Sequence, residues 1–372
     1  MPLDHRAGWA SLLCASVLTL GLSGCAKAQS KPLPVSLEGI DYRTLACPKT
    51  PPTPFTGALT VESKYDQSDV SKSTLREDVS TDSKAIQAAV TDYTKRLVVF
   101  SDYYLRADNP RQAAAALACL DRWLTHWAQA DALTTRDVTK TGVAVRNWAL
   151  AAMASVVVKM ERLTDGQFSL NEVQRAWFAR LADIVIEDYS PRLASDFRYF
   201  NNHDHWAALA VARTGQVLQR ADYGAWAGRV VQRAYDQVHL TADGQYGYWP
   251  NELARAELAA NYMHYALVPL VLLAESAGRQ GLPALTAEQE QRLQALANFS
   301  AQLVLDPGSL KAQVNARQQT VAGYRMAWLI PFLHRYPDHR LARALYQHED
   351  GDVDGYSQIG GRLKPLYGMD DS

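Results

Sequence analysis

The chain has almost no net charge, because its 372 residues carry 38 lysines and arginines against 39 aspartates and glutamates. A protein-wide basic field of the kind that attracts nucleic acid is therefore absent, and no nucleic acid partner is expected. A local basic site is compatible with this balance. Intrinsic disorder is excluded as a class, since 48% of the residues are hydrophobic and can bury a sizeable core.

Cysteine is scarce, with four residues in the chain, and two of them lie in a predicted leader, residues 1–28. The apolar run from Trp9 to Leu22 is too short for a comfortable membrane span and is typical of an export signal. It is followed by Ser23-Gly24-Cys25, which completes a lipobox pattern and makes Cys25 a lipidation candidate. Ala26-Lys27-Ala28 offers a competing signal-cleavage site. Both alternatives predict export to the periplasm, either as a free protein or as an outer-membrane lipoprotein.

The two cysteines outside the leader are Cys47 and Cys119. In an exported protein such a pair indicates one disulfide, which would tie an irregular N-terminal arm to a helix. Two free buried thiols are the alternative.

Strand-like alternation is also scarce, and no internal repeat is visible, so a regular solenoid is not expected. Residues 29–82 are predicted to form a Pro-rich arm and a polar, mobile loop. Residues 83–362 carry long segments with helical periodicity joined by short loops, which typically pack as antiparallel hairpins. They predict an all-α fold, an α/α toroid or incomplete α/α barrel, followed by an irregular tail, residues 363–372. The expected helices span 83–107, 110–130, 140–163, 170–188, 203–220, 223–238, 251–278, 286–303, 320–334 and 338–347.

The first polar stretch of interest runs from Phe200 to Trp206 and reads Phe-Asn-Asn-His-Asp-His-Trp. Asn202 is expected to cap the following helix, which would put His203 in the first turn, where the helix dipole favours an anion. A capping Asn beside a solvated His is the structural alternative. A metal site at His203-Asp204-His205 is disfavoured, because positions i and i+2 of a helix point to different faces, and no metal or cofactor is expected.

The second stretch runs from Tyr246 through Pro250 to Tyr265. Proline suits the first turn of a helix, so a helix is expected to begin there. Arg255 and Tyr262 are seven residues apart, which predicts one helix face and a separation of about 10 Å along the axis. A plain surface pair of Arg and Tyr is the alternative.

Together these stretches carry a resemblance. Asn-Asn-His-x-x-Trp followed by Pro-Asn-Glu-Leu-x-Arg-x-x-x-Ala-x-x-Tyr resembles the periplasmic alginate lyases that cleave poly(β-D-mannuronate), polysaccharide lyase family 5. Ser63-Lys64-Tyr65 and Arg146-x-Trp148 resemble further family motifs in the same order, over most of residues 45–362. Two departures are Gln358, where the family has Arg, and His205, where it has Tyr.

The resemblance implies an α/α toroid with a cleft for an acidic sugar chain such as alginate or polymannuronate. It assigns a catalytic set of Asn202, His203, Arg255 and Tyr262. It also implies a lid with Lys64 and Tyr65, and subsite contacts by Trp148 and Trp206. Alginate export machinery is a further candidate partner.

The implied reaction is β-elimination, in which a base removes the C5 proton of a uronate and the C4 glycosidic bond breaks. Neutralising the uronate carboxylate is the largest electrostatic requirement, and Asn202, His203 and Arg255 are suited to it. Tyr262 could take the proton and return it to the leaving oxygen, since both lie on one side of mannuronate. Positive charge from Arg255 and the helix end is expected to lower the pKa of Tyr262.

Two other functions remain open from the sequence. A glycoside hydrolase on a helical toroid would need paired carboxylates, for which Glu252 and Glu257 are candidates. A non-catalytic polysaccharide-binding envelope lipoprotein would keep the tryptophans but would not need the Arg, Tyr and His residues together.

Overall fold

Eleven α-helices make up most of residues 35–369, the part of the chain that the computed structural model describes. The leader, the lipidation candidate Cys25 and residues 370–372 lie outside the described residues. In chain order the helices are α1 (Thr81–Leu105), α2 (Pro110–Gln129), α3 (Lys140–Leu163), α4 (Glu172–Tyr189), α5 (Asn202–Leu218), α6 (Ala221–Asp236), α7 (Pro250–Leu253), α8 (Ala259–Ser276), α9 (Ala287–Leu305), α10 (Leu329–Arg335) and α11 (Arg340–His348).

Local sequence accounts for most helix boundaries. Ser80, Asn109 and Thr139 each precede a helix, and their side-chain oxygens accept a free backbone N–H of its first turn at 3.0–3.2 Å. Eight expected helices begin and end within two residues of the observed ones. The all-α prediction is thereby confirmed at the level of its elements.

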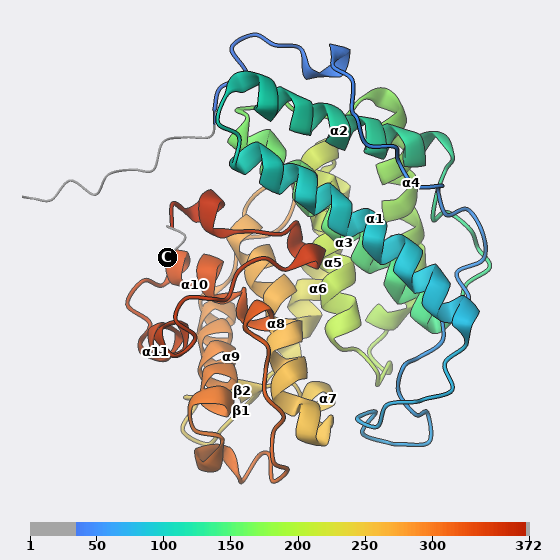
Figure 1. The fold of residues 1–372 in the computed structure, drawn as a ribbon. Helices are drawn as coiled ribbons and strands as arrows, with labels where there is room; N and C mark the ends of the chain where they lie inside the picture. Colours follow the sequence, from blue (N-terminus) through green and yellow to red (C-terminus); the bar gives the residue numbers. More distant parts are fainter. Residues whose placement is uncertain (1–34, 370–372) are drawn as a thin grey trace, which may run out of the picture. The chain divides into compact units, whose positions relative to one another are not determined.

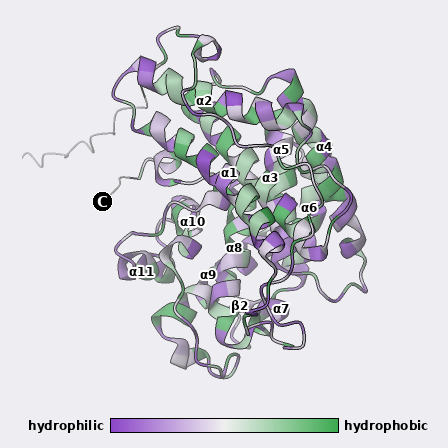
Figure 2. Ribbon diagram, turned by 45° about the vertical axis from the view of Figure 1, so that its right-hand side comes forward, coloured by the Kyte–Doolittle hydropathy of each residue, from purple (hydrophilic) through white to green (hydrophobic). Residues whose placement is uncertain are grey.

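The core is centred on α3 and α5, which pack against each other and against α1, α4, α6 and α8 (Figure 1). Figure 2 shows mainly hydrophobic colouring on α3 and α5, and a mixture of hydrophilic and hydrophobic colouring on the helices and loops around them. Among the described residues, two segments, Lys140–Leu163 and Ala256–Ser276, are long and apolar enough to cross a membrane. They are 83% and 78% buried inside the protein, as expected for core helices.

Two expected helices differ from the structure. The single helix expected over 251–278 is divided into α7, a 3-10 turn (Ala256–Leu258) and α8. The helix expected over 320–334 is a 3-10 turn (Gly323–Met326) followed by the short α10. A small antiparallel hairpin, β1 (His239–Leu240) and β2 (Gly247–Tyr248), was not expected from the sequence.

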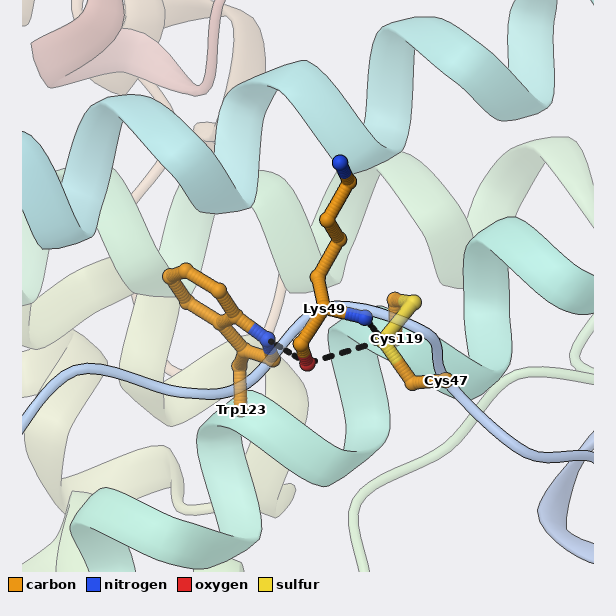
Figure 3. The surroundings of a disulfide bond; sticks show 4 residues. All are labelled: Cys47, Lys49, Cys119 and Trp123. Atoms are coloured by element: carbon orange, nitrogen blue, oxygen red, sulfur yellow. Dashed lines mark hydrogen bonds between the residues drawn. A yellow bond between two sulfur atoms is a disulfide. The ribbon is translucent and has the colours of Figure 1, made fainter.

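The predicted disulfide between Cys47 and Cys119 is confirmed, with the two Cα atoms 4.8 Å apart. Figure 3 shows how the arm is fixed there: Trp123 Nε1 donates to the Lys49 carbonyl at 3.2 Å, and the Lys49 N–H donates to Cys47 Sγ at 3.4 Å. The bridge closes a segment of 72 residues, and such a loop stabilises the fold by about 4 kcal/mol in the chain-entropy model.

The polar segment expected to be a mobile loop folds into a hairpin, here called the lid hairpin (residues 64–76). Asp66 N–H donates to Thr74 O, and Arg76 N–H donates to Lys64 O, both at 2.9 Å. Asp69 accepts hydrogen bonds from Ser71, Ser73 and Thr74 inside the hairpin. In Figure 1 this light-blue segment lies beside α7, far from it in sequence.

Candidate active site

The helix α5 begins one residue earlier than expected. Asn201, not Asn202, is its N-cap: Asn201 Oδ1 accepts from His203 N–H at 3.0 Å, and Asn201 N–H donates to Asp204 Oδ2 at 2.8 Å. This capping box satisfies two free donors at once. It makes Asn202 the first helical residue, with a backbone N–H left for another partner.

The His203-Asp204-His205 run does not converge on one point. Asp204 is buried and paired with Arg192, with contacts of 2.6 and 2.7 Å. His205 is buried on another side, with Nδ1 3.2 Å from Ala266 O. Within residues 35–369, no three His, Cys, Asp or Glu side chains come together in a way that could hold a metal.

Glu252 joins the two polar stretches, a role that sequence reasoning missed. Its buried carboxylate accepts the backbone N–H of Asn202 at 2.6 Å. Asn202 Nδ2 also donates to both Glu252 oxygens, each at 3.0 Å. Burial raises the pKa of Glu252 to about 7, although the bonds from Asn202 and the charge of Arg255 act in the opposite direction. The sequence offers no signal for this bond, since the partners are 50 residues apart.

Arg255 and Tyr262 lie together, but not on one helix face as expected. Arg255 lies in the break between α7 and the following 3-10 turn, and Tyr262 is in the first turn of α8. The guanidinium carbon of Arg255 lies 3.8 Å from the centroid of the Tyr262 ring. This distance is within the range of a cation–π contact.

The pKa of Tyr262 is raised, which corrects the expectation that Arg255 would lower it. Burial of the phenol is the largest cause, and the charge of Arg255 opposes it without overcoming it. Tyr262 therefore holds its proton at neutral pH. The pKa of His203 is lowered to about 4, first by burial and then by the charges of Arg192 and Arg255. The imidazole is therefore also neutral at neutral pH.

Aromatic rings link His203 to Tyr262. The rings of Trp148 and His203 are 5.4 Å apart, those of Trp148 and Tyr265 6.5 Å, and those of Tyr265 and Tyr262 6.4 Å. The structure thus brings all four expected catalytic residues together with Glu252. These five residues, Asn202, His203, Glu252, Arg255 and Tyr262, are called the site cluster below.

The lid hairpin covers the site cluster. The ring of Tyr65 lies 6.4 Å from that of Tyr262 and 5.0 Å from the Arg255 guanidinium, while Lys64 Nζ lies 5.0 Å from the Tyr65 ring. Arg255 Nη2 donates to the carbonyl of Lys72 at 2.7 Å. The expected lid residues therefore occupy the space over the site cluster.

Trp206 does not have the place expected of a subsite residue. It is fully buried and packs against Tyr265 and Tyr356, so it supports the site from below and presents no face to a ligand. A second cation, Arg325, was not expected from the sequence. It lies 4.3 Å from the Tyr265 ring and donates to the Tyr356 hydroxyl at 3.0 Å, and Tyr265 also bonds Gln358.

This arrangement combines a fixed positive charge, a neutral imidazole and a protonated phenol around one buried carboxyl group. Arg255 and the N-terminus of α5 are suited to holding an anion. Near neutral pH Tyr262 can donate its O–H to a ligand, and the neutral imidazole of His203 can both donate and accept a hydrogen bond.

Comparison with known proteins gives a consistent result. The family model described as alginate lyase matches residues 60–310. An alginate lyase of Pseudomonas fluorescens (strain SBW25) is 35% identical over 303 residues, covering 78% of this chain and 76% of its own. One from Pseudomonas putida (strain GB-1) is 31% identical over 371 residues, covering 95% of both chains.

Solved structures show the same fold. Alginate lyase A1-III from Sphingomonas species A1 superposes with a TM-score of 0.64 at 20% identity, covering 91% of this chain and 92% of that one. A variant of that enzyme complexed with a tetrasaccharide gives a TM-score of 0.66 at 20% identity, with 92% of both chains covered. The α/α toroid predicted from the sequence is confirmed by this similarity. With the family model matched over two thirds of its length and several relatives above 30% identity, the chain belongs to the alginate lyase family.

Proposed function

We propose that the protein cleaves poly(β-D-mannuronate) by β-elimination and releases oligosaccharides with unsaturated 4-deoxy uronate at their non-reducing ends. One observation carries the proposal: Glu252 binds Asn202 directly and lies in the field of Arg255, so the polar start of α5 and the Arg255–Tyr262 pair form one site.

The charge of the substrate is the first problem that this site would solve. The C5 proton of a uronate is hard to remove while the neighbouring carboxylate is ionised, because negative charge builds up there in the transition state. Arg255 supplies a permanent positive charge, and His203 supplies a hydrogen-bond donor. Asn202 completes the set when its amide nitrogen is turned to the sugar.

Tyr262 would move the proton. In mannuronate the C5 hydrogen and the C4 oxygen lie on the same side of the ring, within reach of one hydroxyl group. The Tyr262 oxygen accepts the C5 proton while its own proton passes to the leaving oxygen. The C5–H and C4–O4 bonds break, a C4=C5 double bond forms, and Tyr262 ends with one proton as it began.

The lid hairpin would open and close over the sugar chain. In the present conformation Tyr65 covers Tyr262, and Arg255 is bound to the carbonyl of Lys72. A sugar that reaches Tyr262 has to displace these contacts. Closure afterwards would exclude water and bring Lys64 toward the acidic chain.

A hydrolase is disfavoured by the state of its required carboxylates. Glu252 is bound through both oxygens to Asn202, and Asp204 is bound through both oxygens to Arg192. Glu257 lies exposed on the surface, where its carboxylate accepts a hydrogen bond from Gln319. These three residues therefore do not form the pair of facing carboxylates that glycoside hydrolysis uses.

We also propose that the protein acts in the periplasm, free or anchored through Cys25. The leader sequence supports export, and the Cys47–Cys119 bridge agrees with an oxidising compartment. An alginate chain in that compartment, with or without export machinery beside it, is the expected partner.

The substrate is tested with defined polymannuronate and polyguluronate blocks. A rise in ultraviolet absorbance from unsaturated uronate is expected with polymannuronate, and a much smaller rise with polyguluronate. A stronger response to polyguluronate would contradict the mannuronate preference, and no response to either would contradict the activity itself.

A further inference from the structure

The side-chain amide of Asn202 has hydrogen-bond partners for its nitrogen but none for its oxygen. Its Nδ2 donates to both oxygens of Glu252 at 3.0 Å, while its Oδ1 is buried without any hydrogen-bond partner. A buried amide oxygen without a hydrogen-bond donor destabilises the folded protein. Such an orphaned atom beside a set of groups suited to an anion calls for a physical explanation.

The orientation is wrong for an anionic ligand. A sugar carboxylate that meets Asn202 Oδ1 would face another acceptor and gain nothing from it. The donor that it needs is Nδ2, which is held by Glu252. An incoming carboxylate would also approach the Glu252 carboxylate, and two like charges in a buried site oppose each other.

Glu252 has charged and titratable neighbours on every segment packed around it. Those that act on it or on its partner Asn202 are Arg255 and Tyr262 on the second stretch, His203 and Asp204 on α5, Arg192 paired with Asp204, and Tyr65 on the lid hairpin. The one cation among them that is free of a carboxylate partner in this set is Arg255, which the sugar carboxylate would share. An ionised Glu252 and a sugar carboxylate would therefore compete for the charge of Arg255.

We propose that Glu252 is a positioning residue that carries a proton whenever the site holds a uronate. The protonated carboxyl group donates its O–H to Asn202 Oδ1, and its carbonyl oxygen keeps the backbone N–H of Asn202. The Asn202 amide is then turned by half a rotation, and its Nδ2 donates to the sugar carboxylate. This inference rests on the proposed function, since it assigns the ligand as a uronate.

The free protein is poised for this exchange. The pKa of Glu252 is raised to about 7 by burial, and a neighbouring anion would raise it further. Below about pH 7 the carboxyl group is already protonated, so the affinity for a uronate is independent of pH there. Above it, binding takes up one proton from solvent, and linkage requires the affinity to fall by up to about tenfold for each further pH unit.

The test is isothermal titration calorimetry of a mannuronate tetrasaccharide binding to the Tyr262→Phe variant. This variant is expected to bind without turnover, and it removes the phenol as a titrating group. Binding heats in two buffers of different ionisation enthalpy give the number of protons taken up. Uptake is expected to be near zero at about pH 5.5 and to approach one at about pH 8.5.

Two further variants in the Tyr262→Phe background identify the group that takes the proton. Glu252→Gln offers a permanent N–H donor to Asn202 and is expected to abolish both the uptake and the loss of affinity at high pH. His203→Gln removes the other nearby base and is expected to leave the uptake in place. If Glu252→Gln does not fold, the pH dependence of uptake in the Tyr262→Phe variant still tests the inference: uptake near one at about pH 8.5 and near zero at about pH 5.5 supports it, and no uptake at either pH overturns it.

The outcomes separate the inference from the proposed function. Binding with no proton uptake at any pH, or uptake that disappears in His203→Gln, overturns the inference while leaving the lyase proposal intact. No binding of the tetrasaccharide overturns both. Uptake that disappears only in Glu252→Gln supports both.

Discussion

The guanidinium carbon of Arg255 lies 3.8 Å from the centroid of the Tyr262 ring, although the two residues belong to different secondary-structure elements. The same guanidinium reaches the lid through the carbonyl of Lys72. Arg255 thus contacts the proposed proton carrier and the cover of the site at once. Its planar shape permits both, because one face stacks while the edge donates.

Replacement of Arg255 by lysine is therefore expected to be damaging although the charge is kept. An ammonium group cannot stack on Tyr262 and donate to the lid in the same way, so kcat/KM should fall by roughly 100-fold, as for loss of one charge-stabilising donor. Arg136→Lys is the matched control, because Arg136 forms an exposed ion pair with Glu187. Equal activities of the two variants would argue against a special role for Arg255.

The lid hairpin should depend on Asp69. Its carboxylate accepts from the N–H groups of Ser71, Ser73 and Thr74, whereas the carboxylate of Asp66 accepts from the nearby Ser68. Asp69→Ala is expected to loosen the hairpin and raise KM severalfold, with an unchanged circular dichroism spectrum. Asp66→Ala serves as control and should have a smaller effect. A lid that is irrelevant to binding would leave KM unchanged in both variants.

Gly142 fixes the arm against α3. A Cβ atom added there would lie 1.9 Å from the carbonyl oxygen of Leu59, which is backbone and cannot turn aside. Gly142→Ala should therefore lower the free energy of unfolding by about 1–3 kcal/mol or more, measured by denaturant titration. Gly57→Ala is the control, since its added Cβ would make only an ordinary 3.6 Å contact with Phe55. Equal stabilities would refute the close approach.

His264 should make stability depend on pH. Both ring nitrogens are occupied: Nδ1 accepts from Trp328 Nε1 and Nε2 lies against Ser300 O, each at 2.9 Å. Burial lowers its pKa to about 4, against 6.5 for the ordinary side chain. Between these values the unfolded chain binds a proton that the folded protein does not, so stability falls as the pH drops from about 6.5 to about 4, by up to about 3 kcal/mol.

The His264→Gln variant separates this effect from other titrating groups. Glutamine is neutral throughout, so the variant is expected to be less stable than the parent near pH 7 and to lose less stability on acidification. The gap between the two denaturation curves should narrow toward about pH 4. Parallel curves would show that His264 is not responsible.

Much of the fold could be predicted from local signals. The helix α3 begins and ends where the periodicity indicates. Thr139 caps its N-terminus, and most of its residues are apolar and buried. The disulfide could also be predicted, because the sequence places two cysteines outside a predicted export leader. The helix boundary depends on residues next to it in the sequence, and the disulfide prediction depends on the predicted leader.

The break before α8 could not be predicted, because Ala254, Arg255 and Ala256 are all compatible with a helix. It is held from a distance: Gln318 donates to the carbonyl of Ala256 and accepts from the N–H of Ala260. The break determines where Arg255 lies. For the same reason, the bond between Glu252 and Asn202 has no local signature, and the burial that raises the pKa of Tyr262 is invisible in a one-dimensional pattern.

The most direct test of the account is product analysis after digestion of polymannuronate in heavy-oxygen water. Elimination adds no water across the broken bond, so mass spectrometry is expected to show products that are unsaturated and carry no heavy oxygen from solvent at the new ends. Tyr262→Phe should give almost none of these products, while Tyr199→Phe, at an exposed ring, should give the normal amount. Saturated products labelled with heavy oxygen, or full activity of Tyr262→Phe, would contradict the account.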